Sequence, residues 1–462
     1  MNDNQPAIRP AAVLVAVQLP EVDDTEHAAD LAELGRLVDT LGYEVVATVT
    51  QRRPALAAAA VLGEGRLKDL ADLTGGKGVV PSGAPAKKDK ARARRAAAGK
   101  DEADGHEESD EGAESDARKP THVIVDHEIS PSQARNLERA TGAEVLDRTG
   151  VIVEIFHRHA KSREAKLEVE IARLKYVAPR MRETGGGGDR QRGGIGGKGA
   201  GESALELDRR KIRDRIAELK EELESIKKEQ DVRREHRKDA QRVALVGYTN
   251  AGKSSLMRAL TGSDVLIADK LFATLDTTVR ALHPETKPRV LVSDTVGFIK
   301  KLPHDLVASF RSTLDEAREA SLLLYVADAS DPTFRAQLDV TRETLREIGA
   351  HTVPSRLLLN KVDRLEEGER RALHRQYPDA IQLSAKSPDD VAELRQTIVT
   401  FFEQAMIEGE VVVPYTKQSL VNEVFASARV LSEEYDEAGR KMRVLAQPST
   451  IARLQSLLSR QG

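Results

Sequence analysis

Apolar and polar residues alternate with two different periods along the first part of the chain, as they do in proteins that mix strands with helices. A helical pattern begins near Val61, and another opens at Ser130 and Pro131, a serine–proline pair typical of a helix start. Strand-like apolar runs lie at Ala11–Gln18, Glu44–Gln51, His122–Asp126 and Glu144–Asp147. We therefore predict an N-terminal α/β domain over residues 1–160.

This pattern stops between Gly75 and Pro120. The segment holds a basic block at Lys87–Arg95, an acidic block at Asp101–Asp116 and very few apolar residues. It has too little apolar surface to offset the entropy that ordering would cost. We predict a disordered, charged insertion at residues 75–120 that interrupts the α/β domain, and we attach no function to it.

Two long amphipathic stretches follow, separated by a glycine-rich segment at residues 185–201. In both stretches apolar residues recur with the spacing of a coiled-coil seam. The first set is Leu167, Ile171, Leu174, Val177 and Met181, and the second is Ile212, Ile216, Leu219, Leu223 and Ile226. We predict an antiparallel helical hairpin over residues 161–238 with the glycine-rich segment at its tip.

The last half of the chain alternates strands and helices again. Short apolar runs between amphipathic stretches lie at Val243–Val246, Val290–Ser293, Leu322–Ala327, Arg356–Leu359 and Ile381–Leu383. This order predicts an α/β domain with a mostly parallel sheet over residues 240–405. A small α+β domain over residues 406–462 is expected to follow, with strands at Val411–Val413 and Lys441–Leu445, a helix from Ser419 and a terminal helix.

Composition narrows the class of protein. Of the 462 residues, 40% are hydrophobic and 32% are charged, and no apolar run reaches the length of about 18 residues that a membrane span needs. The N-terminus lacks the basic and apolar regions of a secretory signal, and the absence of cysteine excludes disulfides and thiol catalysis. Acidic and basic residues lie in separate blocks that cancel in the net charge of -4, so this value does not exclude any class of binding partner. We expect a cytoplasmic monomer without a membrane span.

The first chemical motif follows the apolar strand that begins at Val243. The segment GYTNAGKS, residues 247–254, stands between a strand and a helix, where a phosphate-binding loop belongs. Glycines let backbone N–H groups turn inward around phosphates, Lys253 can neutralise the outer phosphates, and the Ser254 hydroxyl can bind Mg²⁺. Taken alone, the same letters also fit a glycine-rich turn with a chance Lys-Ser pair after it.

Further motifs appear in the order that a guanine-nucleotide site needs. Asp294 to Gly297, DTVG, end a strand, so an aspartate can hold the Mg²⁺ shell and a glycine amide can contact the γ-phosphate. Asn360 to Asp363, NKVD, follow the next predicted strand but one, and a carboxylate there can accept two hydrogen bonds from guanine but none from adenine. Ser384, Ala385 and Lys386 end the following strand. Together the motifs predict GTP as the ligand.

A segment with several threonines lies between the phosphate loop and DTVG. It runs FATLDTT from Phe272 to Thr278, where a switch threonine must complete the Mg²⁺ coordination when the γ-phosphate is bound. Thr274, Thr277 and Thr278 all carry the hydroxyl that this role needs. Their order in the chain does not choose between them.

These motifs resemble the HflX family of ribosome-associated GTPases, over nearly the whole chain outside residues 75–120. GYTNAGKSSL, FATLD, DTVGFI with LPHDLVASF after it, and NKVD carry the likeness, as do SPSQARNLE, DRTGVIVEIFHRHAKSREAKLEVEIARLKY and GESALELDRR upstream. The glycine-rich segment departs from the family, which more often has an Arg-Gly-Pro-Gly-Glu type sequence before the second helix. This chain lacks that proline, so no residue-level role for the tip is carried over.

The resemblance completes the predicted site. It assigns the Mg²⁺ threonine to Thr274, which with Ser254 forms the predicted metal set. The predicted nucleotide contacts are Gly247, Tyr248, Thr249, Asn250, Ala251, Gly252, Lys253, Ser254, Phe272, Ala273, Thr274, Leu275, Asp276, Asp294, Thr295, Val296, Gly297, Asn360, Lys361, Val362, Asp363, Ser384, Ala385 and Lys386.

One departure from many small GTPases concerns the attacking water. A glutamine often follows the DxxG glycine and orients this water, but here Phe298 follows, and a phenyl ring cannot hydrogen-bond water. No catalytic residue is assigned; Lys253, Thr274 and Gly297 are expected to contact the transition state or the switch. The water-positioning group must come from elsewhere in the chain, from a partner, or from a potassium-type cation. Phe298 itself fits a packing role and a gating role equally well.

The resemblance also implies a partner, because members of this family bind the large ribosomal subunit and separate stalled or idle ribosomes into subunits. Five cations surround the glycine-rich end of the hairpin, where they could reach into folded RNA. They are Arg180, Arg182, Arg190, Arg192 and Lys198. A solvated coiled-coil turn would explain the same charges.

Three functions remain open from the sequence. The first is a GTPase switch that acts on ribosomes. The second is a GTPase switch that recruits a protein effector through the coiled coil, and the third is a nucleotide-binding scaffold with negligible turnover. Steep salt dependence of binding would distinguish RNA from an apolar protein partner, and partner-stimulated hydrolysis would exclude the scaffold.

Overall fold

We describe the fold from a computed structural model, which describes residues 9–80, 119–181, 204–235, 241–262, 271–272, 277–301 and 311–459. The chain divides into two compact units, Met1–Ile152 and Val153–Gly462. The division into four domains that the sequence indicates stays a prediction. Each of the four predicted ranges contains helices or strands of the structure.

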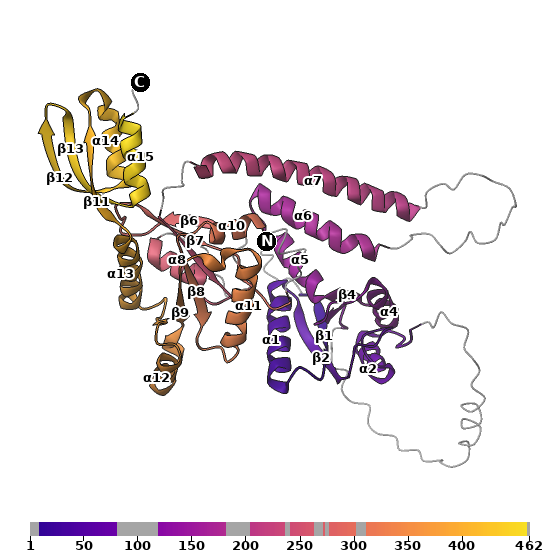
Figure 1. Ribbon diagram of the computed structural model, residues 1–462. Helices are drawn as coiled ribbons and strands as arrows, with labels where there is room; N and C mark the ends of the chain where they lie inside the picture. The colour runs from indigo at the N-terminus through magenta and orange to yellow at the C-terminus, as the bar shows by residue number, and fades with distance from the viewer. Residues whose placement is uncertain are drawn as a thin grey trace, which may run out of the picture. The chain divides into compact units, whose positions relative to one another are not determined.

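The first unit is built on a four-stranded parallel sheet in the order β2-β1-β3-β4 (Figure 1). Seven consecutive buried residues, Ala11 to Val17, make β1 a central strand that is covered on both faces. The helix α4 begins at Pro131 because Ser130 caps it and exchanges hydrogen bonds with Gln133. The strands are β1 Ala11–Gln18, β2 Glu44–Arg52, β3 His122–Val125 and β4 Glu144–Asp147, and the helices are α1 Asp24–Thr40, α2 Glu64–Thr74 and α4 Pro131–Thr141.

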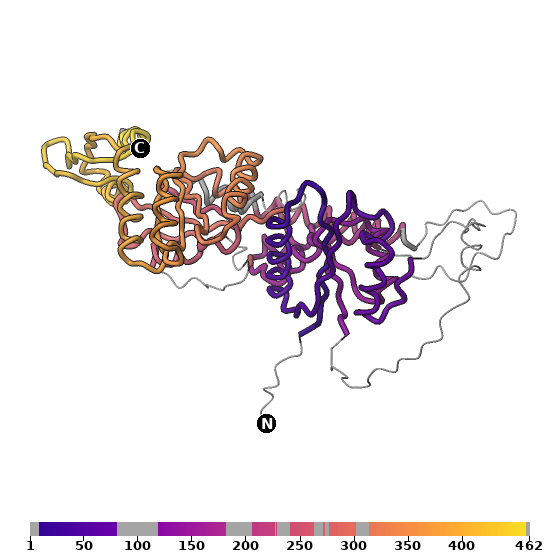
Figure 2. The backbone as a smooth tube through the Cα atoms, turned by 90° about the horizontal axis from the view of Figure 1, so that it is seen from below, coloured from indigo at the N-terminus to yellow at the C-terminus, as the bar shows by residue number. Residues whose placement is uncertain are grey.

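Helices cover both faces of this sheet (Figure 2). One face packs against α2 and α4 through an apolar core that includes Val15, Val123, Leu70 and Leu137, all of them fully buried. The helix α1 contacts β1 and β2 and buries Leu37. The predicted α/β class of this part of the chain is therefore confirmed.

The predicted insertion begins later than expected. Residues 75–80 are ordered: Gly78 N–H donates to Ala140 O at 2.9 Å, and Val80 packs against the apolar core of the first unit. A disordered segment that starts at Gly75 is therefore wrong for these six positions, because the backbone of α4 and its carboxyl end hold them. Residues 81–118, with both predicted charge blocks, lie outside the described residues.

The second unit opens with the end of α5, Arg148–His159, and continues into two helices that lie side by side, α6 Arg163–Val177 and α7 Ala204–Glu235 (Figure 1). A short 3₁₀ turn, η1 Ala178–Arg180, extends α6. Arg163 pairs with Glu222 at 2.6 Å and Arg215 with Glu170 at 3.4 Å, an order that makes the two helices antiparallel. The predicted helical hairpin is confirmed for these helices, and its tip lies outside the described residues.

The two apolar seams predicted for the hairpin face each other. Leu219 of α7 is fully buried against Leu167 and Ile171 of α6. Other seam residues pack around this trio, namely Leu174, Ile216, Leu223 and Ile226. Val177, placed in the same seam by its spacing, is 39% exposed instead, because it lies at the end of α6 beyond the apolar cluster.

A six-stranded sheet in the order β10-β9-β8-β5-β7-β6 follows, parallel except for β6, which runs antiparallel to β7. Its strands are β5 Gln241–Gly247, β6 Thr278–Ala281, β7 Val290–Asp294, β8 Leu322–Asp328, β9 Ser355–Asn360 and β10 Ile381–Gln382. Its helices are α8 Lys253–Thr261, α10 Arg311–Arg318, α11 Phe334–Glu347, α12 Glu367–Gln376 and α13 Pro388–Gln404, with the short turns η2 Ala350–Thr352 and η3 Val362–Arg364. The mostly parallel sheet was predicted, whereas β6 was not.

Two helix layers enclose this sheet. On one face α8 and α13 bury Met257 and Phe402 against β5, β7 and β8. On the other face Phe334 of α11 and Leu373 of α12 pack against Leu359 of β9. A sheet covered on both faces leaves its strand ends as the places where polar side chains can gather.

The chain ends in a three-stranded antiparallel sheet with helices on one face. Strand β13 lies between β11 and β12, and α14 and α15 cover an apolar core that contains Val413, Val424, Val444 and Leu454. The bounds are β11 Ile407–Val413, η4 Tyr415–Leu420, α14 Val421–Ser427, β12 Arg429–Asp436, β13 Gly439–Ala446 and α15 Pro448–Ser459. The sequence did not predict β12. Over the described residues, no helix has the length and apolarity that crossing a bilayer requires.

Candidate guanine-nucleotide site

The predicted motifs meet at one edge of the six-stranded sheet. Strands β5, β7, β8 and β9 are parallel, so their carboxyl ends and the loops that follow lie on the same side. This edge is where open α/β sheets bind ligands. The loops after β5, β7 and β9 carry GYTNAGKS, DTVG and NKVD, and each arrives there directly from a buried strand.

The phosphate loop connects β5 to α8, which begins at Lys253. Gly252 has a φ of 99°, and a Cβ atom there would lie 2.2 Å from Asn360 Nδ2, so only glycine fits between the two loops. The Lys253 ammonium donates to Gly247 O at 3.0 Å and to Tyr248 O at 2.8 Å. These bonds hold the lysine along the inner side of the loop, where its ammonium group could contact a phosphate.

Asn360 joins three of the motif loops. Its side-chain nitrogen donates to Ala251 O at 2.9 Å, and its side-chain oxygen accepts from Ala385 N–H at 3.1 Å. The next residue, Lys361, donates to Asn250 O at 2.7 Å. The phosphate loop, NKVD and the Ser384–Lys386 loop therefore form one hydrogen-bonded unit, although Ala251 and Ala385 are 134 positions apart in sequence.

Asp363, the predicted guanine-reading residue, is held by the Ser384–Lys386 loop. Its carboxylate accepts from the Ser384 hydroxyl at 2.7 Å and lies 3.6 Å from Lys386 Nζ. The Ser384 hydrogen bond, with help from Lys386, lowers the pKa of the Asp363 carboxyl. The group therefore stays ionised near neutral pH, the form that could accept hydrogen bonds from two guanine N–H groups.

The candidate metal ligands lie beside the phosphate loop. The Ser254 hydroxyl donates to Asp294 Oδ2 at 2.7 Å, and Asp294 is fully buried at the end of β7. Thr278 is the first residue of β6 and pairs with Asp294 across the sheet. Thr274 and its neighbours Ala273, Leu275 and Asp276 lie outside the described residues, and Phe272 beside them is buried.

The rest of DTVG packs under the phosphate loop. The Thr295 hydroxyl donates to Leu245 O at 2.7 Å, which ties this loop to β5, and Val296 is buried. Phe298 is 2% exposed. Burial fits the packing role for Phe298 and places no hydrogen-bonding side chain at the position where many GTPases have glutamine.

Among the candidate RNA contacts, only Arg180 lies within the described residues. Its guanidinium lies 3.7 Å from the centre of the Tyr176 ring and donates to Tyr176 O at 3.0 Å. These contacts hold the Arg180 side chain against the end of α6. Arg182, Arg190, Arg192 and Lys198 fall in the segment between α6 and α7 that lies outside the described residues.

Two acidic residues of the site were missed by the sequence analysis. Asp328 ends β8 and pairs with Lys361 at 2.6 Å, and Asp390 accepts from Ser384 N–H at 2.7 Å. Each therefore orients a motif residue. A polar residue that ends a buried strand is a recognisable pattern, so Asp328 could have been found, whereas Asp390 is an ordinary first-turn acid of α13.

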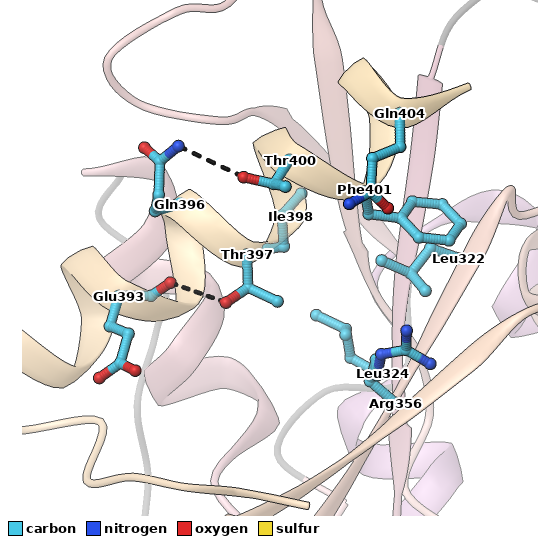
Figure 3. Close-up of a pocket in the computed structure, with 10 residues that line it drawn as sticks. All are labelled: Leu322, Leu324, Arg356, Glu393, Gln396, Thr397, Ile398, Thr400, Phe401 and Gln404. Atoms are coloured by element: carbon cyan, nitrogen blue, oxygen red, sulfur yellow. Dashed lines mark hydrogen bonds between the residues drawn. The ribbon is translucent and has the colours of Figure 1, made fainter. Parts of the chain in front are cut away.

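A separate groove lies at the opposite edge of the same sheet, between α13 and the beginnings of β8 and β9 (Figure 3). It has a volume of about 290 Å³, and Leu322, Arg356 and Phe401 are among its lining residues. The Thr397 hydroxyl in its wall donates to Glu393 O at 3.0 Å, within α13. The predicted nucleotide residues do not line this groove, which is therefore distinct from the motif site.

The titration of Lys253 predicts how nucleotide affinity depends on pH. Burial lowers the pKa of the Lys253 ammonium to about 8, against the opposing effect of Asp294. Phosphates bind the protonated form of the ammonium, so affinity should fall as the pH rises through the pKa of Lys253. We expect GDP affinity to fall roughly tenfold between about pH 7.5 and about pH 9. Calorimetry in two buffers of different ionisation enthalpy would detect the accompanying proton uptake; affinity that stays constant over this range would contradict it.

Comparisons with known proteins agree with the arrangement of motifs. Three family models match: "GTP-binding GTPase N-terminal" at residues 28–80 and 95–157, "GTP-binding GTPase Middle Region" at 159–237, and "50S ribosome-binding GTPase" at 242–361. The chain is 64% identical over 450 residues to GTPase HflX of Gluconacetobacter diazotrophicus, covering 97% of this chain and 98% of that protein.

More distant relatives match over most of their length as well. Identity to GTPase HflX of Escherichia coli is 37% over 391 residues, which covers 84% of this chain and 82% of that protein. A solved structure of a GTP-binding protein from Sulfolobus solfataricus in complex with GDP is 23% identical, with a TM-score of 0.42, and covers 85% of this chain and all of that one.

Proposed function

This chain belongs to the HflX family of GTPases, and from that premise we propose that it binds the large ribosomal subunit and separates stalled or idle ribosomes into subunits. GTP binding drives docking, and hydrolysis drives release. The observation that supports binding to the ribosome is the helical hairpin formed by α6 and α7. The protein acts in the cytoplasm as a monomer, and a fraction of it is bound to ribosomes.

The hairpin has the properties of an RNA probe. A two-helix stalk whose seam buries Leu219 is stiff, and the sequence between the helices is short, rich in glycine and cationic. Phosphates dominate the affinity of proteins for RNA, and shape guides where a protein docks. We propose that the cations between α6 and α7 contact ribosomal RNA, namely Arg182, Arg190, Arg192 and Lys198, with Arg180 at the stalk's end.

The hairpin supports an RNA partner better than a protein effector. An effector that pairs with a coiled coil needs free apolar seam positions, and the seam of α7 already packs against α6 through residues such as Ile216 and Leu223. Ion pairs also join the two helices, for example Arg163 of α6 with Glu222 of α7. Recruitment of a protein effector remains the alternative that the experiment below tests.

The nucleotide is proposed to bind with Mg²⁺. Ser254 and Asp294 offer adjacent hard oxygen atoms, the ligand type that Mg²⁺ prefers, and their hydrogen bond at 2.7 Å places both at the phosphate loop. Ser254 and Thr274 would ligate the ion, and the ion would neutralise charge on the phosphates. With Phe298 after DTVG, the attacking water takes its orientation from another residue of this chain, from the ribosome, or from K⁺ beside the phosphates.

The experiment measures GTP turnover with and without purified large subunits. We compare the natural chain with a tip variant in which Arg182, Arg190, Arg192 and Lys198 are glutamine. Subunits should stimulate turnover of the natural chain, and the tip variant should lose most of that stimulation while its turnover without subunits stays unchanged. A matched control replaces four exposed cations on the body of α7 by glutamine, namely Arg209, Lys211, Arg213 and Lys220.

Two further readouts separate the candidate functions. Binding to subunits that weakens steeply as salt rises indicates phosphate contacts, whereas weak salt dependence favours an apolar protein partner. Sedimentation of intact ribosomes after incubation with protein and GTP reports whether they separate. Stimulation that the tip variant retains in full, or that the control variant loses equally, would overturn the proposed role of the tip.

A further inference from the structure

The phosphate loop and the loop that follows β7 are joined by backbone hydrogen bonds. Thr249 N–H donates to Phe298 O at 2.8 Å, and Phe298 N–H donates to Gly247 O at 3.1 Å. These two bonds form a short parallel bridge between Tyr248 and Phe298. The residue directly after DTVG is therefore held against the phosphate loop by main-chain atoms.

A side chain of the phosphate loop adds a third bond to this bridge. Lys300 N–H donates to the hydroxyl oxygen of Tyr248 at 2.6 Å, and Tyr248 is only 5% exposed. Phe298 and Ile299 between these points are also buried. We call the three bonds, two from the backbone bridge and one to the Tyr248 hydroxyl, the latch.

Gly297, next to the latch, packs tightly against the phosphate loop. Gly297 packs so tightly that a Cβ atom there would lie 2.8 Å from Thr249 Cα and 2.9 Å from Lys253 Nζ. In a GTPase the γ-phosphate binds between this lysine and the amide of this glycine. A phosphoryl group is larger than one carbon atom, so a γ-phosphate entering beside Lys253 is expected to displace Gly297 from the Thr249 backbone, which the latch opposes.

A buried hydroxyl group next to the latch favours its opening. The Thr249 hydroxyl is buried and has no hydrogen-bond partner within the described residues. A buried hydroxyl without a partner is costly, and movement of the loop would let water or a phosphate oxygen reach it. The closed latch is therefore opposed by this cost and held by the bonds to Phe298 and Lys300.

We propose that Tyr248 is a positioning residue that sets the preference of this GTPase between GTP and GDP. Its hydroxyl stabilises the closed latch, GTP binds only when the latch opens, and GDP binds in either state because it lacks the γ-phosphate. A ligand that favours one state loses affinity in proportion to the rarity of that state, whereas a ligand indifferent to both loses none. The inference concerns the GTPase site itself and does not depend on the ribosome.

The test replaces Tyr248 by phenylalanine, which removes the hydroxyl and keeps the ring. Affinities for GDP and for a non-hydrolysable GTP analogue are measured by calorimetry without ribosomes. The lost hydroxyl bond to Lys300 should raise affinity for the analogue about three- to tenfold more than it changes affinity for GDP. The matched control, Tyr377→Phe, alters a partly buried tyrosine packed against another core of the same domain and should change neither.

A second variant weakens the latch by removing a different side chain. Phe298→Ala removes a buried ring that helps hold the closed loop, and it should raise the ratio of analogue to GDP affinity further than Tyr248→Phe does. Thermal unfolding checks that both variants fold. The inference is overturned if analogue affinity stays constant or falls in Tyr248→Phe, or if the two affinities move together.

Discussion

Replacing Asp363 by asparagine should weaken GTP binding by about 100-fold. In the proposed site the carboxylate accepts from two N–H donors of guanine, and hydrogen bonds to a charged group are each worth about 1.5–3 kcal/mol. Asparagine turns one acceptor into a donor, so one guanine N–H would face another N–H. A loss of about 2.7 kcal/mol corresponds to the expected 100-fold change in the dissociation constant, measured by fluorescence of a labelled nucleotide.

The same variant should gain affinity for xanthosine triphosphate. Xanthine has a carbonyl oxygen where guanine has its amino group, and the asparagine amide can donate to that oxygen. The bond from the Ser384 hydroxyl to position 363 can survive the change, because the amide oxygen still accepts. Asp379→Asn, at an exposed position of the same domain, is the matched control. If GTP and xanthosine triphosphate lose affinity equally, Asp363 supports the loop and does not read the base.

Elements with strong local patterns were predicted closely. The buried run of β1 coincides with the predicted strand Ala11–Gln18, and the predicted helix start at Ser130 and Pro131 agrees with the capping of α4. The heptad spacing of α7 predicted its packing on α6. In these cases short stretches of sequence carry the information, because burial on a fixed face or a capping side chain determines the element.

Elements that depend on distant partners were missed. Strand β12, Arg429–Asp436, is charged, contains an irregularity after Val430 and forms an edge, so its apolar alternation is weak. Strand β6, Thr278–Ala281, has four residues and is recruited by pairing with β7. The order of residues 75–80 likewise comes from contacts with α4, more than fifty positions away. Tertiary pairing, which no local window contains, determines all three.

The candidate site likewise has a part that the sequence predicted and a part that it did not. The motif letters predicted which loops would gather at the carboxyl edge of the sheet, because each follows a parallel strand. The contacts between those loops were not predicted, among them the Tyr248 hydroxyl with Lys300 N–H and Lys361 with Asp328. Such contacts join loops of different strands, so they appear only when the strand order is known. They are also the contacts through which the state of one loop can affect another.

The largest expected effect on stability comes from the first unit, where Arg148 is 1% exposed at the start of α5. Its guanidinium donates to Asp126 Oδ1 at 2.8 Å and also pairs with Glu33, and both carboxylates are buried. Arg148→Met removes the only cation of this trio and leaves two buried carboxylates without it, so we expect a loss of about 3–5 kcal/mol. Denaturant-dependent hydrogen exchange at the β1 and β3 amides measures the free energy of opening of this unit separately from the rest of the chain.

Neutralising the carboxylates distinguishes lost charge pairing from lost packing. The triple variant Arg148→Met, Asp126→Asn, Glu33→Gln removes the buried negative charges as well, so it should recover part of the loss, since an uncompensated buried charge costs more than a neutral polar group. Arg66→Met, at an exposed arginine paired with Asp69, should change the free energy of opening by less than about 1 kcal/mol. A single variant Arg148→Met that behaves like this control would show that solvent or neighbouring groups already compensate the two acids, and the trio would then contribute little to the fold.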